Sequence, residues 1–120
     1  MIYHIIKNLH VLVNAGAYLD IERTIIELSF YPGKPRFIID PVSVMTSILR
    51  QTFYDRFYDW FVKKALEAVH QDKLSGTIID IGAFIGDTAE YFALKGANEV
   101  VAYEPVSRLY NLLIRNIQYK

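Results

Sequence analysis

The chain has 120 residues, 52% of them hydrophobic and 22% charged, a composition that excludes an intrinsically disordered protein and suits one domain with a buried core. Thirteen basic and thirteen acidic side chains cancel, so no net charge favours nucleic acid as a partner. No stretch approaches the roughly 18 consecutive apolar residues of a membrane span, so no membrane partner is expected. Cysteine is absent, which excludes disulfides and thiolate metal sites and fits a cytoplasmic setting.

The N-terminal stretch has apolar residues at helical spacing. Those on one face are Ile2, Ile5, Ile6, Leu9 and Val13. The pattern predicts a short amphipathic helix that docks on the domain or on a partner. An interfacial membrane anchor is the alternative, and it is disfavoured because the polar face lacks the basic cluster that such helices use.

Two β-branched and aromatic runs follow, at residues 22–30 and 36–40. The segment Tyr31–Lys34 lies between them and contains both Pro and Gly, as turns commonly do. These features together predict a β-hairpin.

From Val42 to about His70 the apolar spacing becomes helical, with a break near Tyr54–Arg56 that divides the region into two helices. The aromatic residues on its apolar face are Phe53, Phe57, Trp60 and Phe61. We expect this face to pack inward. A base-stacking platform is the alternative, and it is disfavoured because the basic groove that accompanies stacking is missing.

The remaining C-terminal part has the pattern of strand, loop, helix, strand and helix. Thr77–Ile81 is β-branched with little alternation, which is typical of strands covered on both faces in parallel α/β sheets. After the glycine loop 82–86 we expect a helix at 87–95, a strand at 99–104 and a last helix beginning at Ser107. This order predicts a parallel pair of strands.

The residues at the ends of these two strands indicate a nucleoside site. Ligands bind at the carboxyl ends of parallel strands, and glycine lets the backbone approach them without a Cβ in the way. Glu104 ends the second strand, where a carboxylate can accept the hydroxyls of a ribose. Asp80 and Asp87 flank the loop and would repel a pyrophosphate. This favours S-adenosylmethionine, whose ammonium and sulfonium groups are cationic, over NAD or FAD.

The segment "IIDIGAFIGDTAEYFALKGANEVVAYEPVSRLYNLLIRNI" resembles the first motifs of class I S-adenosylmethionine-dependent methyltransferases. It is most similar to the FkbM-type branch, whose first motif is D-x-G-A-N-x-G and whose second strand ends in E-P. The resemblance covers roughly residues 25–117, and its specific part is 78–105.

The resemblance implies a set of cofactor-binding residues. They are Asp80, Gly82, Ala83, Phe84, Gly86, Asp87, Thr88 and Glu104. Asp80 and the two glycines would line the methionine part of the cofactor, and Glu104 would hold the ribose. Phe84 stands where the branch often has Asn, and its side chain either narrows the loop or packs inward.

The expected fold is therefore α/β, with two segments. Residues 1–76 would form an N-terminal helix, a β-hairpin and a helical connector, and residues 77–120 the first βαβα part of a Rossmann-like methyltransferase fold with a truncated sheet. In such a sheet the strand at 77–81 has an open edge. The hairpin, a second copy or a complementing chain would cover that edge, and self-association into a homo-oligomer is the preferred expectation.

The leading functional hypothesis is an FkbM-like methyltransferase, or the cofactor-binding part of one, that acts on a small-molecule or sugar acceptor. One alternative is a non-catalytic truncated remnant that serves assembly or interaction. Another is an NAD-binding oxidoreductase fragment. The sequence identifies no catalytic base, and the scattered histidines His4, His10 and His70 lack the spacing of a metal site.

Overall fold

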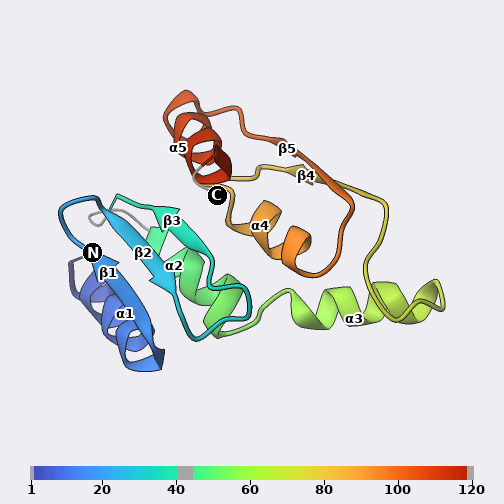
Figure 1. Ribbon diagram of the computed structural model, residues 1–120, viewed down its shortest axis with the longest axis horizontal. Coiled ribbons are helices and arrows are strands. Elements are labelled where there is room, and N and C mark those ends of the chain that lie inside the picture. Colours follow the sequence, from blue (N-terminus) through green and yellow to red (C-terminus); the bar gives the residue numbers. More distant parts are fainter. Residues whose placement is uncertain (1, 41–44, 119–120) are drawn as a thin grey trace.

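The computed structural model describes residues 2–40 and 45–118, which form a mixed α/β protein with an antiparallel and a parallel sheet (Figure 1). The elements are α1 (Ile2–Ala15), β1 (Ala17–Asp20), β2 (Ile25–Leu28), β3 (Arg36–Ile38), α2 (Met45–Leu49), the π-helix η1 (Arg50–Tyr54), α3 (Asp59–Ala68), β4 (Thr77–Ile81), α4 (Asp87–Leu94), β5 (Glu99–Tyr103) and α5 (Ser107–Gln118). The α/β class expected from the sequence is confirmed.

The N-terminal sheet is antiparallel in the order β1-β2-β3. The predicted hairpin is confirmed, because β2 and β3 pair in the register Ile25↔Ile38. Its turn is closed by the amide of Lys34, which donates to the carbonyl oxygen of Tyr31. The first strand, β1, was not expected, because four residues give too short an alternation to distinguish a strand from the end of a helix.

Helix α1 packs against the domain, which is one of the two dockings that the sequence predicted. The face that it buries differs from the predicted one. Leu12 is fully buried, whereas Val13, predicted on the inner face, is 48% exposed. Leu9 is partly buried against the core, and its spacing of three from Leu12 places both on the same side of the helix. The side chains of Ile2, Ile5 and Ile6 lie outside the described part of the structure.

The helical connector is divided as predicted, since η1 ends at Tyr54 and α3 begins at Asp59. Val42, where the helical pattern starts, lies outside the described residues. The prediction that the whole aromatic face packs inward is wrong. Phe53 is buried, but Phe57, Trp60 and Phe61 are 51–60% exposed. Arg56 has φ 56°, so the chain turns there, and α3 extends away from the core (Figure 1).

The C-terminal sheet consists of β4 and β5, which are parallel, with pairs from Thr77↔Glu99 to Ile81↔Tyr103. The predicted parallel pair is confirmed. The expectation that β4 is covered on both faces is wrong, because α4 packs on one face only and Ile79 and Ile81 are 64% and 82% exposed on the other. The hairpin does not cover the edge of β4, since the two sheets are separate.

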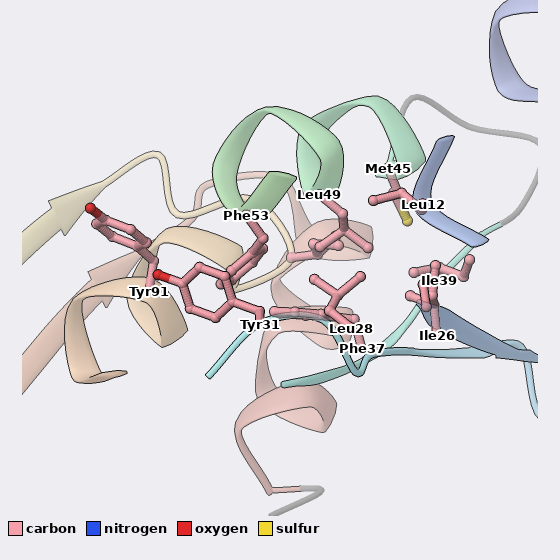
Figure 2. Close-up of a cluster of buried hydrophobic side chains, with 12 residues drawn as sticks. Leu12, Ile26, Leu28, Tyr31, Phe37, Ile39, Met45, Leu49, Phe53 and Tyr91 are labelled. Carbon is pink, nitrogen blue, oxygen red and sulfur yellow. The ribbon is translucent and has the colours of Figure 1, made fainter. Parts of the chain in front are cut away.

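One hydrophobic cluster joins the two segments (Figure 2). Its labelled members are Leu12, Ile26, Leu28, Tyr31, Phe37, Ile39, Met45, Leu49, Phe53 and Tyr91. Phe53 of η1 lies at the centre, with its ring centroid 4.9 Å from that of Tyr31 and 6.4 Å from that of Tyr91. Residues before and after position 76 therefore share one core.

Asn116 of α5 is a buried polar residue that connects three parts of the chain. Its Oδ1 accepts the amide of Ile38 in β3 at 2.6 Å. Its Nδ2 donates to the carbonyl oxygen of Ile85 in the glycine loop at 2.8 Å. Buried backbone groups are costly without partners, so this side chain stabilises the contact between β3, α5 and the loop.

Asn116→Ala is expected to lower the free energy of unfolding by about 2–4 kcal/mol, because it leaves the amide of Ile38 and the carbonyl of Ile85 unpaired. Urea denaturation followed by circular dichroism measures the change. Asn111→Ala, on the exposed side of the same helix, is the matched control and should shift stability by about 0.5 kcal/mol or less. Equal effects of the two substitutions would contradict this role of Asn116.

Candidate functional site

The candidate site begins at the loop that connects β4 to α4. Gly82 and Gly86 have φ 81° and 90°, a left-handed conformation that favours glycine. The amides of Gly82 and Ala83 both donate to the carbonyl oxygen of Tyr103, at 2.8 and 2.9 Å. These bonds fasten the loop to the carboxyl end of β5 and bring the ends of the two strands together.

Glu104 follows β5 and holds the same loop through its side chain. Its Oε2 accepts the amide of Phe84 at 2.9 Å, and its Oε1 accepts the amide of Val106 at 2.9 Å. A carboxylate has about four lone-pair positions, so each oxygen keeps one for a further donor. The carboxylate is thus fixed in orientation and still able to accept two hydroxyl groups.

A depression of about 490 Å³ lies beside this carboxylate. Its lining residues are Ile81, Gly82, Tyr103, Glu104 and Pro105. A Cβ built on Gly82 meets no atom within 4 Å, so the space above this glycine is open. The lining is almost entirely apolar and includes part of Glu104, so the depression is suited to a flat, largely apolar ligand.

Asp80 and Thr88 form a second connection, on the α4 side of β4. Asp80 is buried, and its Oδ2 accepts the hydroxyl of Thr88 at 2.6 Å. This bond ties the end of β4 to the first turn of α4. It therefore fixes the angle at which the loop leaves the strand.

The side chain of Asp87 turns into the protein and away from the depression. It is 2% exposed, and its Oδ2 accepts the hydroxyl of Thr52 in η1 at 2.8 Å. Burial raises the pKa of Asp87 to about 6, although the hydrogen bond from Thr52 opposes the shift. The nearby charge of Asp80 adds to the rise in pKa. Asp87 is thus half of a buried pair between η1 and α4.

Phe84 has φ 54°, which is a strained conformation for a bulky side chain. The sequence left two orientations open, and the structure places the side chain inward, partly buried against the hydrophobic core. Asn, which the resembled family often has here, adopts this conformation more easily. Packing against the core and the bond from its amide to Glu104 offset the strain.

The eight residues predicted from the sequence therefore divide into two groups. Gly82 and Glu104 line the depression, and Phe84 takes part through its backbone amide, which donates to Glu104. The others support the loop from behind, among them Asp87. The sequence analysis did not identify Thr52 and Asn116. The signal that could have identified them is a polar residue at a position where the helical spacing expects a core residue.

A third polar contact ties α4 to α3. The hydroxyl of Tyr91 donates to Oδ1 of Asp59 at 2.6 Å, and Nζ of Lys95 lies 3.3 Å from the same oxygen. Burial and this hydrogen bond raise the pKa of Tyr91. Its hydroxyl therefore stays protonated and acts as a structural donor.

No protein-family model, curated protein or solved structure matches this chain. Within residues 2–40 and 45–118, no helix has the length and apolar character needed to cross a bilayer. In the same described part, no three His, Asp or Glu side chains gather where they would hold a metal ion. The chemistry of the site therefore rests on its own geometry.

Asp87 is expected to make the protein less stable as the pH rises. The unfolded chain has the ordinary pKa of 3.8, whereas the folded protein holds the proton up to about pH 6. The stability that the protonated carboxyl group contributes is fully present below pH 3.8, and it is lost as the pH rises through about 6. The shift corresponds to about 3 kcal/mol at neutral pH.

Asp87→Asn removes this titration while keeping an oxygen that accepts from Thr52. The variant should gain up to about 3 kcal/mol relative to the wild type between about pH 4 and about pH 7. Urea denaturation at a series of pH values measures the difference. Asp72→Asn, which changes an exposed carboxylate, is the control. A difference between Asp87→Asn and the wild type that stays constant with pH would contradict the prediction.

Proposed function

We propose that this chain is an S-adenosylmethionine-dependent methyltransferase similar to the FkbM type, or the cofactor-binding part of one. The proposal treats β4, the glycine loop, α4 and β5 as the start of a Rossmann-like sheet. A parallel strand pair with a loop at its carboxyl end supports it, because ligands of open α/β sheets bind at that edge.

The observation that carries the proposal is the carboxylate of Glu104 beside the open space at Gly82. Two backbone amides orient it, and each oxygen retains a lone pair for a ribose hydroxyl. The apolar surface of Ile81 and Tyr103 in the same depression suits an adenine or a ribose face.

The charges at the loop favour a cationic cofactor over a dinucleotide. Asp80 lies in β4, two residues before the loop, and Asp87 directly after the loop is the first residue of α4. Both side chains are bonded inside the protein, to Thr88 and Thr52, but their negative charge lies close to this helix end. That charge would oppose a pyrophosphate there and would favour the cationic ammonium and sulfonium groups of S-adenosylmethionine. These residues support the cofactor class and disfavour an NAD-binding oxidoreductase.

The proposed reaction is methyl transfer to an oxygen of a small molecule or a sugar. Bound S-adenosylmethionine supplies a methyl group on a sulfonium. The transfer would exchange the C–S bond for a C–O bond and release S-adenosylhomocysteine, and the acceptor hydroxyl would lose its proton to a base. The residues of this chain would bind and orient the cofactor, which is the chief requirement of such a transfer.

Gly82→Ala is expected to abolish binding of S-adenosylhomocysteine with little loss of stability. The new Cβ meets no protein atom within 4 Å, so the only steric conflict is with a ligand in the depression. The left-handed φ adds a strain of about 1 kcal/mol. Isothermal titration calorimetry measures affinity, and thermal unfolding of the same samples measures stability.

Gly76→Ala is the matched control for this variant. Gly76 precedes the same strand, has φ 77° and also has no atom within 4 Å of a built Cβ, but it lies at the opposite end of β4. Both alanine variants should lose similar stability, and only Gly82→Ala should lose affinity. Equal affinity in the two variants would rule out a ligand at Gly82. Preferential binding of NAD by the wild type would instead favour the oxidoreductase.

Glu104→Gln should weaken the same ligand by about tenfold or more, because one carboxylate oxygen becomes an NH2 group that can accept neither a ribose hydroxyl nor the backbone amide bound there. Glu99→Gln is the control, since Glu99 begins β5 and accepts the hydroxyl of Thr77, far from the depression. Calorimetry at one ionic strength compares the two. The assignment of Glu104 to the ribose fails where both variants bind like the wild type.

The second candidate is a non-catalytic protein that acts in assembly. Ile79, Ile81 and Tyr103 lie on one face of the parallel sheet and are 58–82% exposed, and parallel sheets are normally covered on both faces. A second copy or a complementing chain on this face would supply the missing cover. A stable oligomer with no affinity for S-adenosylhomocysteine would favour this function.

Ile79→Lys tests the assembly function. It should convert an oligomer to a smaller species, because a desolvated ammonium on the sheet face is costly. Sedimentation velocity measures the mass. Ile21→Lys, at an isolated exposed position between β1 and β2, is the control and should leave the mass unchanged. A wild type that stays monomeric at high concentration would contradict the assembly function.

A further inference from the structure

The contact between Thr52 and Asp87 joins the helical connector to the first turn of α4. Both side chains are buried, with exposed fractions of 1% and 2%. The hydroxyl of Thr52 donates to Oδ2 of Asp87 at 2.8 Å. The two residues are 35 positions apart in sequence, so this bond is a long-range connection, and it ends one residue from the glycine loop.

The surroundings of Asp87 hold few other polar groups. Asp80 faces it from β4, and Tyr58 faces it from the segment before α3, where burial and the charges of Asp87 and Asp80 raise the pKa of the phenol. The carboxylate of Asp87 also accepts the backbone amides of Asp87 and Thr88, at the start of α4. Thr52 is the neighbour that donates a side-chain hydrogen bond from outside these C-terminal elements. The position of Asp87 therefore depends on η1.

A displacement of the first turn of α4 would be transmitted to the loop. The amide of Glu90 donates to the carbonyl oxygen of Gly86 at 3.0 Å. The amide of Gly86 in turn donates to the carbonyl oxygen of Ala83 at 2.9 Å. The next residue, Phe84, supplies the amide that Glu104 binds. The path from Thr52 to Glu104 thus consists of short hydrogen bonds and one loop.

The Thr52 hydroxyl also comes from an unusual element. The segment Arg50–Tyr54 is a π-helix. Single π-turns are rare in proteins, and those that occur often lie at functional sites. The adjacent Phe53 is held at the centre of the core. Thr52 is thus buried in a packed segment, as a positioning residue requires.

We propose that Thr52 is a positioning residue for the glycine loop, and that residues 1–76 thereby contribute to the cofactor site. This inference rests on the proposed function, because it assigns a role within the same site. The hydroxyl of Thr52 fixes the first turn of α4 through Asp87, and the turn sets the backbone that presents the amide of Phe84 to Glu104. Thr52 does not touch the cofactor.

Thr52→Val tests the proposal, because it keeps the shape of the side chain and removes the hydroxyl. It should weaken S-adenosylhomocysteine by about tenfold or more, since a hydrogen bond to a charged group is lost. It should also speed hydrogen exchange at the amide of Phe84. Thr52→Ser keeps the hydroxyl and should restore affinity to within about threefold of the wild type. Calorimetry and exchange measured by NMR provide the two readouts.

Thr46→Val is the matched control. Thr46 lies in α2 and is also fully buried, but its hydroxyl has no hydrogen-bond partner among the described residues. The substitution should leave both the affinity and the exchange of Phe84 unchanged. Should Thr52→Val fail to fold, the pair Thr52→Ala and Thr46→Ala makes the same comparison.

The two readouts separate this inference from the proposed function. A Thr52→Val protein that is less stable but keeps wild-type affinity and wild-type exchange at Phe84 would overturn the positioning role. A folded wild type without affinity for S-adenosylhomocysteine would refute the cofactor. In that case the exchange decides the role of Thr52: faster exchange only in Thr52→Val supports control of the loop, and no change overturns it.

Discussion

The placement of the antiparallel sheet next to the glycine loop of the parallel sheet depends on the hydrogen bonds of the Asn116 side chain. In the order β1-β2-β3, β3 is an edge strand, and its Ile38 amide would be unpaired without a partner outside the sheet. Asn116 accepts that amide and donates to the loop at Ile85. An amide side chain offers both a donor and an acceptor without charge, as these two contacts require. A single buried residue therefore pairs with the backbone of an edge strand and also holds the loop of the candidate site.

The glycine loop is consequently fixed from several directions at once. Asn116 holds the carbonyl of Ile85, Glu104 holds the amide of Phe84, and Thr52 holds Asp87 at the start of α4. This over-determination explains how Phe84 keeps a left-handed backbone, which costs about 1–2 kcal/mol for a residue other than glycine. Strain of this kind persists where the surrounding structure supplies more than one restraint.

How far the sequence predicts the structure depends on the kind of signal. The boundaries of β4, the loop and α4 follow closely from Thr77–Ile81 and the two glycines, because local backbone requirements decide them. The faces of the helices that pack inward cannot be predicted in this way, because they depend on which elements contact one another in the fold. Trp60 has the spacing of a core residue, yet the turn at Arg56 carries α3 away from the core.

The candidate site shows the same division. Glu104 and Gly82 are predictable because the edge of a parallel sheet brings strand ends together. The inward turn of Asp87 and the role of Thr52 are not, because they result from a contact across 35 positions. A threonine three residues after Leu49 in an apolar helical face carries the signal of a buried polar contact, but the signal does not name its partner.

The restraints on the loop also bear on how a ligand would bind. A loop that must be ordered by its ligand reduces affinity by the conformational entropy lost on binding. Here the loop is ordered beforehand by bonds to the protein core, so the free lone pairs of Glu104 already point in fixed directions. Affinity at such a site depends on residues that never touch the ligand. Asn116 and Thr52 lie in the interior of the protein and would contribute to the proposed site only by holding the loop.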